Sequence, residues 1–213
     1  MVRLLGRRAG WLLGNLPPPE GGGRALDVGC GWGHYVRSAE RLGWFAVGVE
    51  RDARRLRVAR VVTPSLVLAD AGALPFGAGQ YHLVTLWHVL EHLPAPRQAL
   101  EEARRILAPG GVLLLEVPHP LSLQARLAGP RWLHWAPHVH YWHFTRGTLR
   151  ALVEAAGFRV RALHSWPNAA GWCRTWGFSP RWDPVCALLD VFATGVGRGG
   201  VLRLLAVKPC NSM

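Results

Sequence analysis

Three carboxylates follow short apolar segments in the first third of the chain. Asp27 lies in the segment ALDVGCGWG, Glu50 ends FAVGVE, and Asp70 ends SLVLAD. If these segments are parallel strands of one sheet, their carboxyl ends meet at one edge, and the three side chains gather there. A carboxylate accepts hydrogen bonds from ribose hydroxyls or from the adenine amine, repels phosphate and attracts a cation. The set predicts a pocket for a nucleoside that carries positive charge.

The turn after Asp27 has the sequence GCGWG at residues 29–33. Glycine allows the backbone to approach a ligand closely, and such a turn aims the N-terminus of the next helix at that ligand. A nicotinamide-dependent dehydrogenase would need the spacing GxGxxG, but residue 34 is His, and Trp32 and Asp27 crowd the place of a pyrophosphate. S-adenosylmethionine carries sulfonium and ammonium cations, so we expect it to be the ligand of this turn.

Two histidines follow the apolar segment YHLVTLW at residues 81–87. His88 and His92 lie beside the expected position of the methyl group. Either is a candidate general base, because imidazole titrates near neutral pH, and structural packing is the alternative explanation. Glu91, which stands between them in the sequence, is expected on a helix surface. Such a base would serve an acceptor with a hydroxyl or an amine.

Histidines are also dense between residues 119 and 143, where His138, His140 and His143 have a spacing that could bind zinc. No Asp, Glu or Cys lies among them to complete a ligand set, and their aromatic neighbours suit a substrate pocket. We therefore expect no bound metal. His140 and Tyr141 are expected to contact the substrate, with simple packing of this segment as the alternative.

Apolar segments of strand type alternate with amphipathic helical segments, which predicts a parallel sheet covered by helices on both faces. Segments 119–144 and 167–199 do not fit this alternation, and we interpret them as caps over a pocket within a single domain of residues 1–213. Residues 1–23 form an N-terminal extension of that domain. The expected strands are 24–29, 45–50, 65–70, 81–87, 112–118, 158–166 and 201–209. The expected helices are 34–42, 51–62, 96–107 (closed by Pro109-Gly110-Gly111), one capped by Thr145, and one near 185–194.

The composition suits one α/β domain and argues against a disordered chain or a membrane-spanning protein. The net charge is +12, but among the 25 basic residues only Lys208 is lysine, and Ile106 is the only isoleucine. This bias indicates a G/C-rich coding sequence, so we discount the charge as a sign of nucleic-acid binding. The four cysteines form no CxxC pair, which favours a reducing compartment. No long apolar run predicts a membrane span, and we expect a cytoplasmic chain without a secretory leader.

Five segments between residues 24 and 118 resemble motifs of the class I S-adenosylmethionine-dependent methyltransferases. They are ALDVGCGWG, GVERD, DAGALPF, LVTLWHVLEHLPAP and ILAPGGVLLLEVP. Residues 138–158 are more loosely similar to the small-molecule branch that includes the quinone-biosynthesis enzymes. The resemblance implies a three-layer, Rossmann-like α/β fold with a seven-stranded sheet in the order 3-2-1-4-5-7-6, in which strand 7 is antiparallel. It also implies SN2 transfer of the sulfonium methyl to an acceptor, which leaves S-adenosylhomocysteine.

The resemblance assigns roles to single residues. Asp27, Gly29 and Gly31 would hold the methionine part and Glu50 the ribose. Asp70 and Ala71 would flank the adenine, and Trp87 would face the cofactor after strand four. The full set implied for the cofactor is Asp27, Gly29, Cys30, Gly31, Glu50, Arg51, Asp70, Ala71 and Trp87. The family usually has Phe-Asp where this chain has Tyr81-His82, and the change concerns local packing.

The expected partner is a small-molecule acceptor. Two alternatives stay open at this point: an RNA methyltransferase, which the charge suggests, and a non-catalytic protein that keeps the fold and binds S-adenosylmethionine. Against the first, no RNA-binding motif is visible in the sequence. The sequence predicts neither the acceptor atom nor an oligomeric state.

Overall fold

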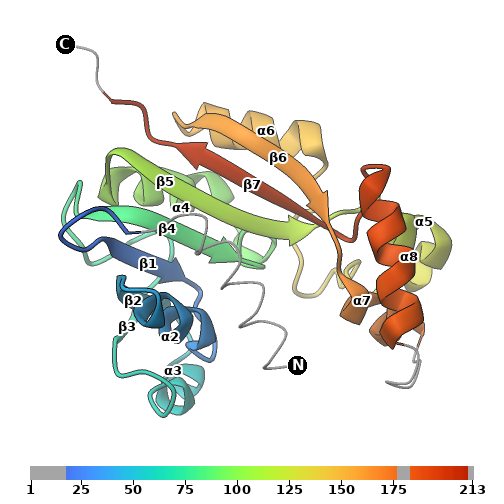
Figure 1. Cartoon of the computed structure of the whole chain (residues 1–213), viewed down its shortest axis with the longest axis horizontal. Helices are drawn as coiled ribbons and strands as arrows, with labels where there is room; N and C mark the ends of the chain where they lie inside the picture. The colour runs from blue at the N-terminus through green and yellow to red at the C-terminus, as the bar shows by residue number, and fades with distance from the viewer. Residues whose placement is uncertain (1–17, 177–182, 211–213) are drawn as a thin grey trace.

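The computed structural model describes residues 18–176 and 183–210 of the 213-residue chain. Their strands form one seven-stranded sheet in the order β3-β2-β1-β4-β5-β7-β6 (Figure 1). β1 to β5 pair in parallel, and β7 is antiparallel to both β5 and β6. The predicted strand order and the antiparallel β7 are confirmed. The strands are β1 (Arg24–Val28), β2 (Phe45–Glu50), β3 (Leu66–Leu68), β4 (Tyr81–Trp87), β5 (Leu107–Pro118), β6 (Arg159–Trp166) and β7 (Val201–Val207).

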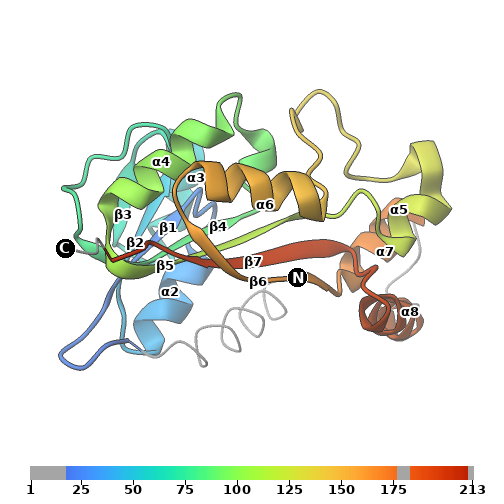
Figure 2. The same ribbon diagram turned by 90° about the horizontal axis from the view of Figure 1, so that it is seen from above.

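Helices cover both faces of this sheet, so the core has two apolar layers. α2 (His34–Arg41) and α3 (Ala53–Ala59) bury residues in one cluster, which also contains Leu83 and Leu114. α4 (Pro96–Ile106) and α6 (Arg146–Ala155) bury residues in a larger cluster. Figure 2 shows α4 and α6 on one face of the sheet and α2 on the other. The sheet is therefore the rigid middle layer that positions the loops at its edges.

Local signals explain where the helices begin. Asp52 caps α3, because its Oδ1 accepts hydrogen bonds from the backbone N–H groups of Arg54 (2.8 Å) and Arg55 (3.3 Å). Thr145 and Thr148 form a capping box at the start of α6, so the predicted cap is confirmed. Pro96 occupies the first turn of α4, where its missing N–H is not needed.

The predicted end of α4 is wrong. The helix stops at Ile106, because Leu107 is already extended and pairs with Tyr81 of β4. The Pro109-Gly110-Gly111 segment lies inside β5 and does not close the helix. The register there jumps from Tyr81–Leu107 to Leu83–Val112, so this segment forms an irregularity in the strand.

The Tyr81-His82 pair fits its surroundings. Tyr81 is fully buried and meets the Phe76 ring edge-on at 5.2 Å between centroids. His82 is exposed, and its Nδ1 accepts a hydrogen bond of 3.1 Å from the backbone N–H of Arg24. The imidazole thus accepts a backbone hydrogen bond at the start of β1, and β4 still pairs with β1 from Leu83 onward.

The two segments that break the alternation contain α5 (Leu123–Ala128), α7 (Ala169–Trp176) and α8 (Asp183–Gly195). These helices pack on one another beyond the end of β5 (Figure 1). Trp132 forms a small apolar cluster with Ala125, Ala128 and Trp176. In the described residues, no helix is both long and apolar enough to cross a membrane. Residues 1–17 of the predicted N-terminal extension and 177–182 of the second cap lie outside the described residues.

Gly48, in the middle of β2, provides a test of how tightly the core cluster under α2 and α3 is packed. A Cβ at Gly48 would lie 2.7 Å from Cys30 Sγ and 2.8 Å from Val36 Cγ2, so Gly48→Ala should lower the free energy of unfolding by about 1–3 kcal/mol. Gly195→Ala is the matched control, because a Cβ there meets no atom within 4 Å. Urea denaturation should show it to be neutral or stabilising by up to about 1 kcal/mol. Equal effects of the two substitutions would contradict the packing described here.

Candidate functional site

The carboxyl ends of β1, β2 and β3 lie side by side, because β2 pairs in parallel with both neighbours. Gly29 and Gly31 of the following turn have φ angles of +69° and +54°, which favour glycine. A Cβ on Gly29 would lie 2.5 Å from Val89 Cγ2, whereas a Cβ on Gly31 would meet nothing within 4 Å. The turn is therefore backed by Val89 and open at Gly31, where a ligand can reach the backbone.

Glu50 ties this turn to the end of β2. Its Oε2 accepts a hydrogen bond from the Gly31 N–H (3.1 Å), and its Oε1 accepts one from the Asp52 N–H (3.0 Å). The side chain is only 6% exposed. A carboxylate has about four acceptor positions, so each oxygen can still accept a hydrogen bond from a hydroxyl group. Glu50 thus holds the shape of the turn and still has acceptor capacity for a ribose.

Asp27 is buried at the end of β1. Burial raises its pKa, the hydrogen bond from Thr85 Oγ1 (2.7 Å) lowers it, and the charge of Glu50 raises it, with the result that the pKa is about 7. The carboxyl group is therefore partly protonated at neutral pH. A cation beside it would favour the ionised form.

The other residues of the predicted cofactor set differ in what their side chains can offer. Asp70 is exposed and accepts the Gly72 N–H at 2.8 Å, while Ala71 is buried next to it. Arg51 is exposed. The Cys30 thiol is buried in the core cluster with Val36, and burial raises its pKa. Cys30 therefore belongs to the turn through its backbone, and its thiol belongs to the core.

Trp87 lies at the end of β4, next to the end of β1 at this edge of the sheet. Its ring packs against the Tyr35 ring, with the centroids 5.1 Å apart. The Arg203 guanidinium lies 5.8 Å from the Trp87 ring and 4.6 Å from the Trp166 ring. The indole is thus fixed between α2 and β7, and its predicted contact with the cofactor stays a prediction.

His88 connects two buried carboxylates. Its Nδ1 donates to Glu91 Oε1 and its Nε2 donates to Glu116 Oε1, both at 3.1 Å, and Arg203 Nε donates to Glu116 Oε2. Burial would lower the pKa of His88, but the two carboxylates raise it to about 10. Likewise, burial would raise the pKa of Glu116, but His88 and Arg203 lower it to about 2. An imidazolium has no lone pair to accept a proton, so the geometry does not support His88 as a general base.

His92 keeps a lone pair. Its Nδ1 lies 2.8 Å from the carbonyl oxygen of Val139, which can only accept, so Nδ1 carries the hydrogen and Nε2 is unprotonated in the neutral ring. The same argument applies to His140, whose Nδ1 lies 2.7 Å from the His134 carbonyl oxygen. The two rings are 4.6 Å apart between centroids. Of the two predicted bases, His92 therefore has the proton-accepting nitrogen.

The first cap segment folds back over this place. The Tyr141 N–H donates to the carbonyl oxygen of Glu91 at 2.9 Å, and Trp142 Nε1 donates to that of Leu93 at 2.9 Å. These bonds bring His140 next to the 3-10 turn η1 (Leu90–His92) that follows β4. The Tyr141 side chain is 62% exposed. The substrate roles of His140 and Tyr141 stay predictions.

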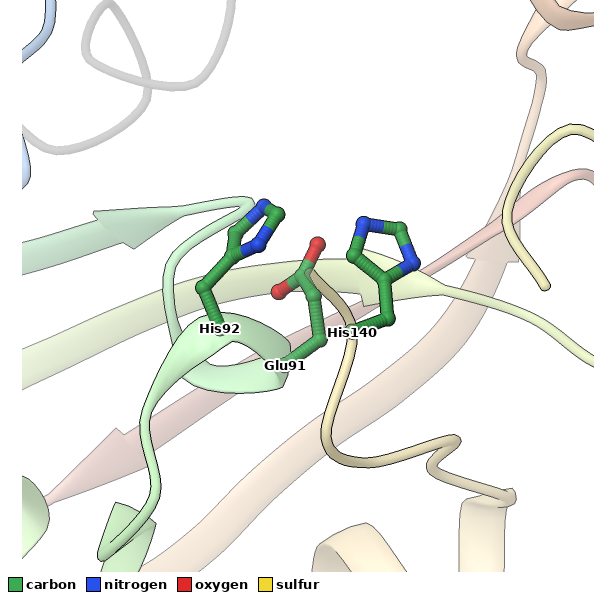
Figure 3. A group of neighbouring side chains, drawn as sticks. All are labelled: Glu91, His92 and His140. Atoms are coloured by element: carbon green, nitrogen blue, oxygen red, sulfur yellow. The ribbon is translucent and has the colours of Figure 1, made fainter. Parts of the chain in front are cut away.

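Glu91 was expected on a helix surface, and this expectation is wrong. The residue is 1% exposed, and its carboxylate lies between the His92 and His140 rings (Figure 3). No metal was expected because the histidines between residues 119 and 143 have no acidic residue among them. Glu91 lies outside that segment in the sequence but beside His140 in the fold. The spacing of His88 and Glu91, three residues apart, was a signal that the two face each other in a short helical turn.

Comparisons with known proteins identify the family of the chain. A family model described as "Methyltransferase domain" matches residues 5–163. The ubiquinone biosynthesis O-methyltransferase of Cereibacter sphaeroides (strain KD131) is 30% identical over 153 residues. That match covers 66% of this chain and 62% of the relative, so the chain spans less than two thirds of the relative's length.

Solved structures support the fold. A SAM-dependent methyltransferase from Archaeoglobus fulgidus has a TM-score of 0.69 at 20% identity, over 98% of this chain and 95% of that chain. The cyclase SpnF has a TM-score of 0.68 at 22% identity, over 96% of this chain and 81% of that chain. Because proteins named for different reactions share it, the fold alone does not specify the chemistry.

The buried ion pair between Arg203 and Glu116 can be tested by stability. Arg203→Met should lower the free energy of unfolding by about 3 kcal/mol, because Glu116 then keeps only His88 as a counter-charge. Arg159→Met, at an exposed position at the start of β6, should change it by less than about 0.5 kcal/mol. Chemical denaturation at pH 7 measures both. Similar small changes would show that the pair does not stabilise the fold.

Proposed function

The chain belongs to the class I S-adenosylmethionine-dependent methyltransferase family, and on this premise we propose that it transfers the cofactor's methyl group to a small-molecule acceptor. The observation that carries the proposal is the edge formed by the open Gly31, Asp27 and Glu50. S-adenosylmethionine supplies an electrophilic methyl group, and S-adenosylhomocysteine is the product. The residues at this edge fit that cofactor because they offer acceptors and negative charge at a turn that leaves its backbone accessible.

Each residue of the edge has a separate binding role. Asp27 in its ionised form balances the positive charge of the methionine part, and Glu50 accepts hydrogen bonds from the ribose hydroxyls. Asp70 accepts one from the adenine amine, with Ala71 beside the base. None of these roles requires the side chains to move far, because Glu50 and Asp70 are already held by backbone N–H groups.

The acceptor occupies the other half of the edge, between the end of β4 and the first cap. His92 Nε2 takes the proton of an acceptor hydroxyl or amine, while His140 and Tyr141 contact the acceptor. Methyl transfer depends mainly on alignment of the nucleophile with the sulfonium–methyl bond, which a closed and water-poor pocket provides. The cap over η1 supports this arrangement, because it already contacts Glu91 and Leu93 through backbone oxygens.

The cytoplasm is the proposed location. Cys30 and Cys210 are free thiols among the described residues, which suits a reducing compartment. The net charge of +12 is the one feature that favours an RNA substrate instead.

The experiment that tests the proposal is turnover of S-adenosylmethionine labelled in the methyl group. The chain is incubated with a panel of phenols, amines and carboxylic acids, and in parallel with total RNA. Label in a small molecule supports the proposal, and label only in RNA overturns it in favour of the RNA methyltransferase. Tight cofactor binding without transfer to any acceptor would overturn it in favour of a non-catalytic or cyclase-like protein.

Asp27 predicts how cofactor affinity depends on pH. Its pKa is about 7 in the free protein, and the cationic ligand lowers it, so binding releases a proton below pH 7. Affinity for S-adenosylmethionine should therefore rise between pH 5 and pH 7, by up to about tenfold per pH unit. Calorimetry should show this slope in the wild type and in Asp70→Asn, and a flat profile in Asp27→Asn. A slope retained in Asp27→Asn would assign the proton to another group.

Glu50 predicts the strength of ribose binding. Glu50→Gln replaces one charged acceptor with an amide donor and should weaken S-adenosylmethionine binding by about 1.5–3 kcal/mol. Glu101→Gln, on the exposed face of α4, should leave the affinity unchanged. Because Glu50 also holds Gly31 and Asp52, thermal unfolding of each variant is measured alongside binding. Lower stability with unchanged affinity would show that Glu50 shapes the turn but does not bind ribose.

A further inference from the structure

We propose that Glu91, His92 and His140 form a site for one divalent transition-metal ion of the zinc type. One donor atom from each residue lies within 4.8 Å of the other two. Glu91 and His92 come from η1, and His140 comes from the cap across it (Figure 3). No single stretch of sequence contains all three, so the fold is what brings them together.

The rings of His92 and His140 are both oriented by hydrogen bonds of the kind that metal-binding histidines make. A histidine that binds a metal through one nitrogen usually donates the N–H of the other nitrogen to a carbonyl or carboxylate, which fixes the ring. His92 Nδ1 donates to the Val139 carbonyl oxygen at 2.8 Å, and His140 Nδ1 donates to that of His134 at 2.7 Å. In the neutral form of both rings, this geometry leaves the Nε2 lone pair available to a metal.

One of the two carboxylate oxygens of Glu91 has no hydrogen-bond partner among the described residues. Oε1 accepts from His88 at 3.1 Å, which holds the carboxylate in place. Oε2 is buried and finds no hydrogen-bond partner among the residues that the structure describes. An acceptor buried without a partner costs about 1–3 kcal/mol, and a bound cation removes that cost. This orphaned oxygen is the observation that points to an ion and not merely to a pair of packed histidines.

The donor set selects the kind of metal. Two imidazoles and one carboxylate occupy three positions around zinc and leave the fourth open, which is the pattern of catalytic zinc sites. Magnesium and calcium prefer oxygen ligands throughout.

The site needs only a small adjustment. Zinc–ligand bonds of about 2.1 Å place tetrahedral donor atoms about 3.4 Å apart, so donor atoms that lie within 4.8 Å of one another must close by at most about 1.4 Å. Bound metal would then link the cap to the end of β4. If the proposed function holds, the open position accepts an oxygen of the methyl acceptor and lowers the pKa of its hydroxyl group. With the ion bound, His92 Nε2 is a metal ligand and no longer the base described above, so solvent takes the proton.

Zinc binding to the metal-free full-length chain tests the proposal. Competition against a chromophoric chelator should give one ion per chain and a dissociation constant of about 1 µM or below. Magnesium at millimolar concentration should not compete. His140→Gln and Glu91→Gln should each weaken zinc binding at least tenfold. His138→Gln is the matched control, because His138 is an exposed histidine of the same cap, and it should bind like the wild type.

Thermal unfolding gives a second measurement on the same proteins. Zinc should raise the midpoint of the wild type and of His138→Gln but not that of His140→Gln or Glu91→Gln, because only a folded site binds the ion. Equal zinc binding by all four proteins, or its loss in His138→Gln, would overturn the site. These measurements need no methyl donor or acceptor. A failed metal site therefore leaves the proposed methyl transfer untouched, and a chain that binds zinc without transferring methyl groups would contradict only the proposed function.

Discussion

The parallel pairing of β1 with β2 on one side and with β4 on the other is the constraint on which both halves of the site depend. It places the turn after β1, the carboxylate at the end of β2 and the residues after β4 at the same edge of the sheet. Glu50 can reach the Gly31 N–H only because β1 and β2 are adjacent. Thr85 can donate to Asp27 only because β4 lies on the other side of β1. The halves of the edge that we propose for the cofactor and for the acceptor therefore meet at β1 and β4, and the cap lies beside the second of them.

A charge cluster of His88, Glu116 and Arg203 holds the residues after β4 in place. Glu116 on β5 meets His88 after β4 and Arg203 on β7, so three neighbouring strands are connected by one carboxylate. Buried charges persist in proteins when they are paired and hydrogen-bonded, and here each carboxylate oxygen of Glu116 has a cationic partner. His88 is held with a φ of +53°, a conformation that a non-glycine residue rarely adopts. Its ring is thereby directed to Glu91 as well, and the orientation of Glu91 between the rings of His92 and His140 follows from the same cluster.

The strands and the acidic edge could be predicted from local patterns in the sequence: an apolar strand, its glycine turn, or a carboxylate at its end. The strand order was implied by the resemblance to the methyltransferase motifs. Features set by contacts between distant segments could not be predicted. Glu91 becomes a buried residue only when the cap segment folds back over η1. The proton on His88 is set by Glu116 on another strand. The position of Pro109-Gly110-Gly111 inside β5 depends on pairing with β4, although Pro and Gly at a helix end normally indicate a break.

The insertion of β7 between β5 and β6 has a consequence for the order in which the molecule is assembled. β6 pairs only with β7 in the described sheet, although it is synthesised first. During vectorial synthesis on the ribosome, β1 to β5 can complete their ladder while β6 still waits for its only neighbour. Arg203 arrives with that last strand, so Glu116 acquires its second cationic partner at the end of folding. The half of the edge that we propose for S-adenosylmethionine can thus form in the nascent chain well before the half that we propose for the methyl acceptor.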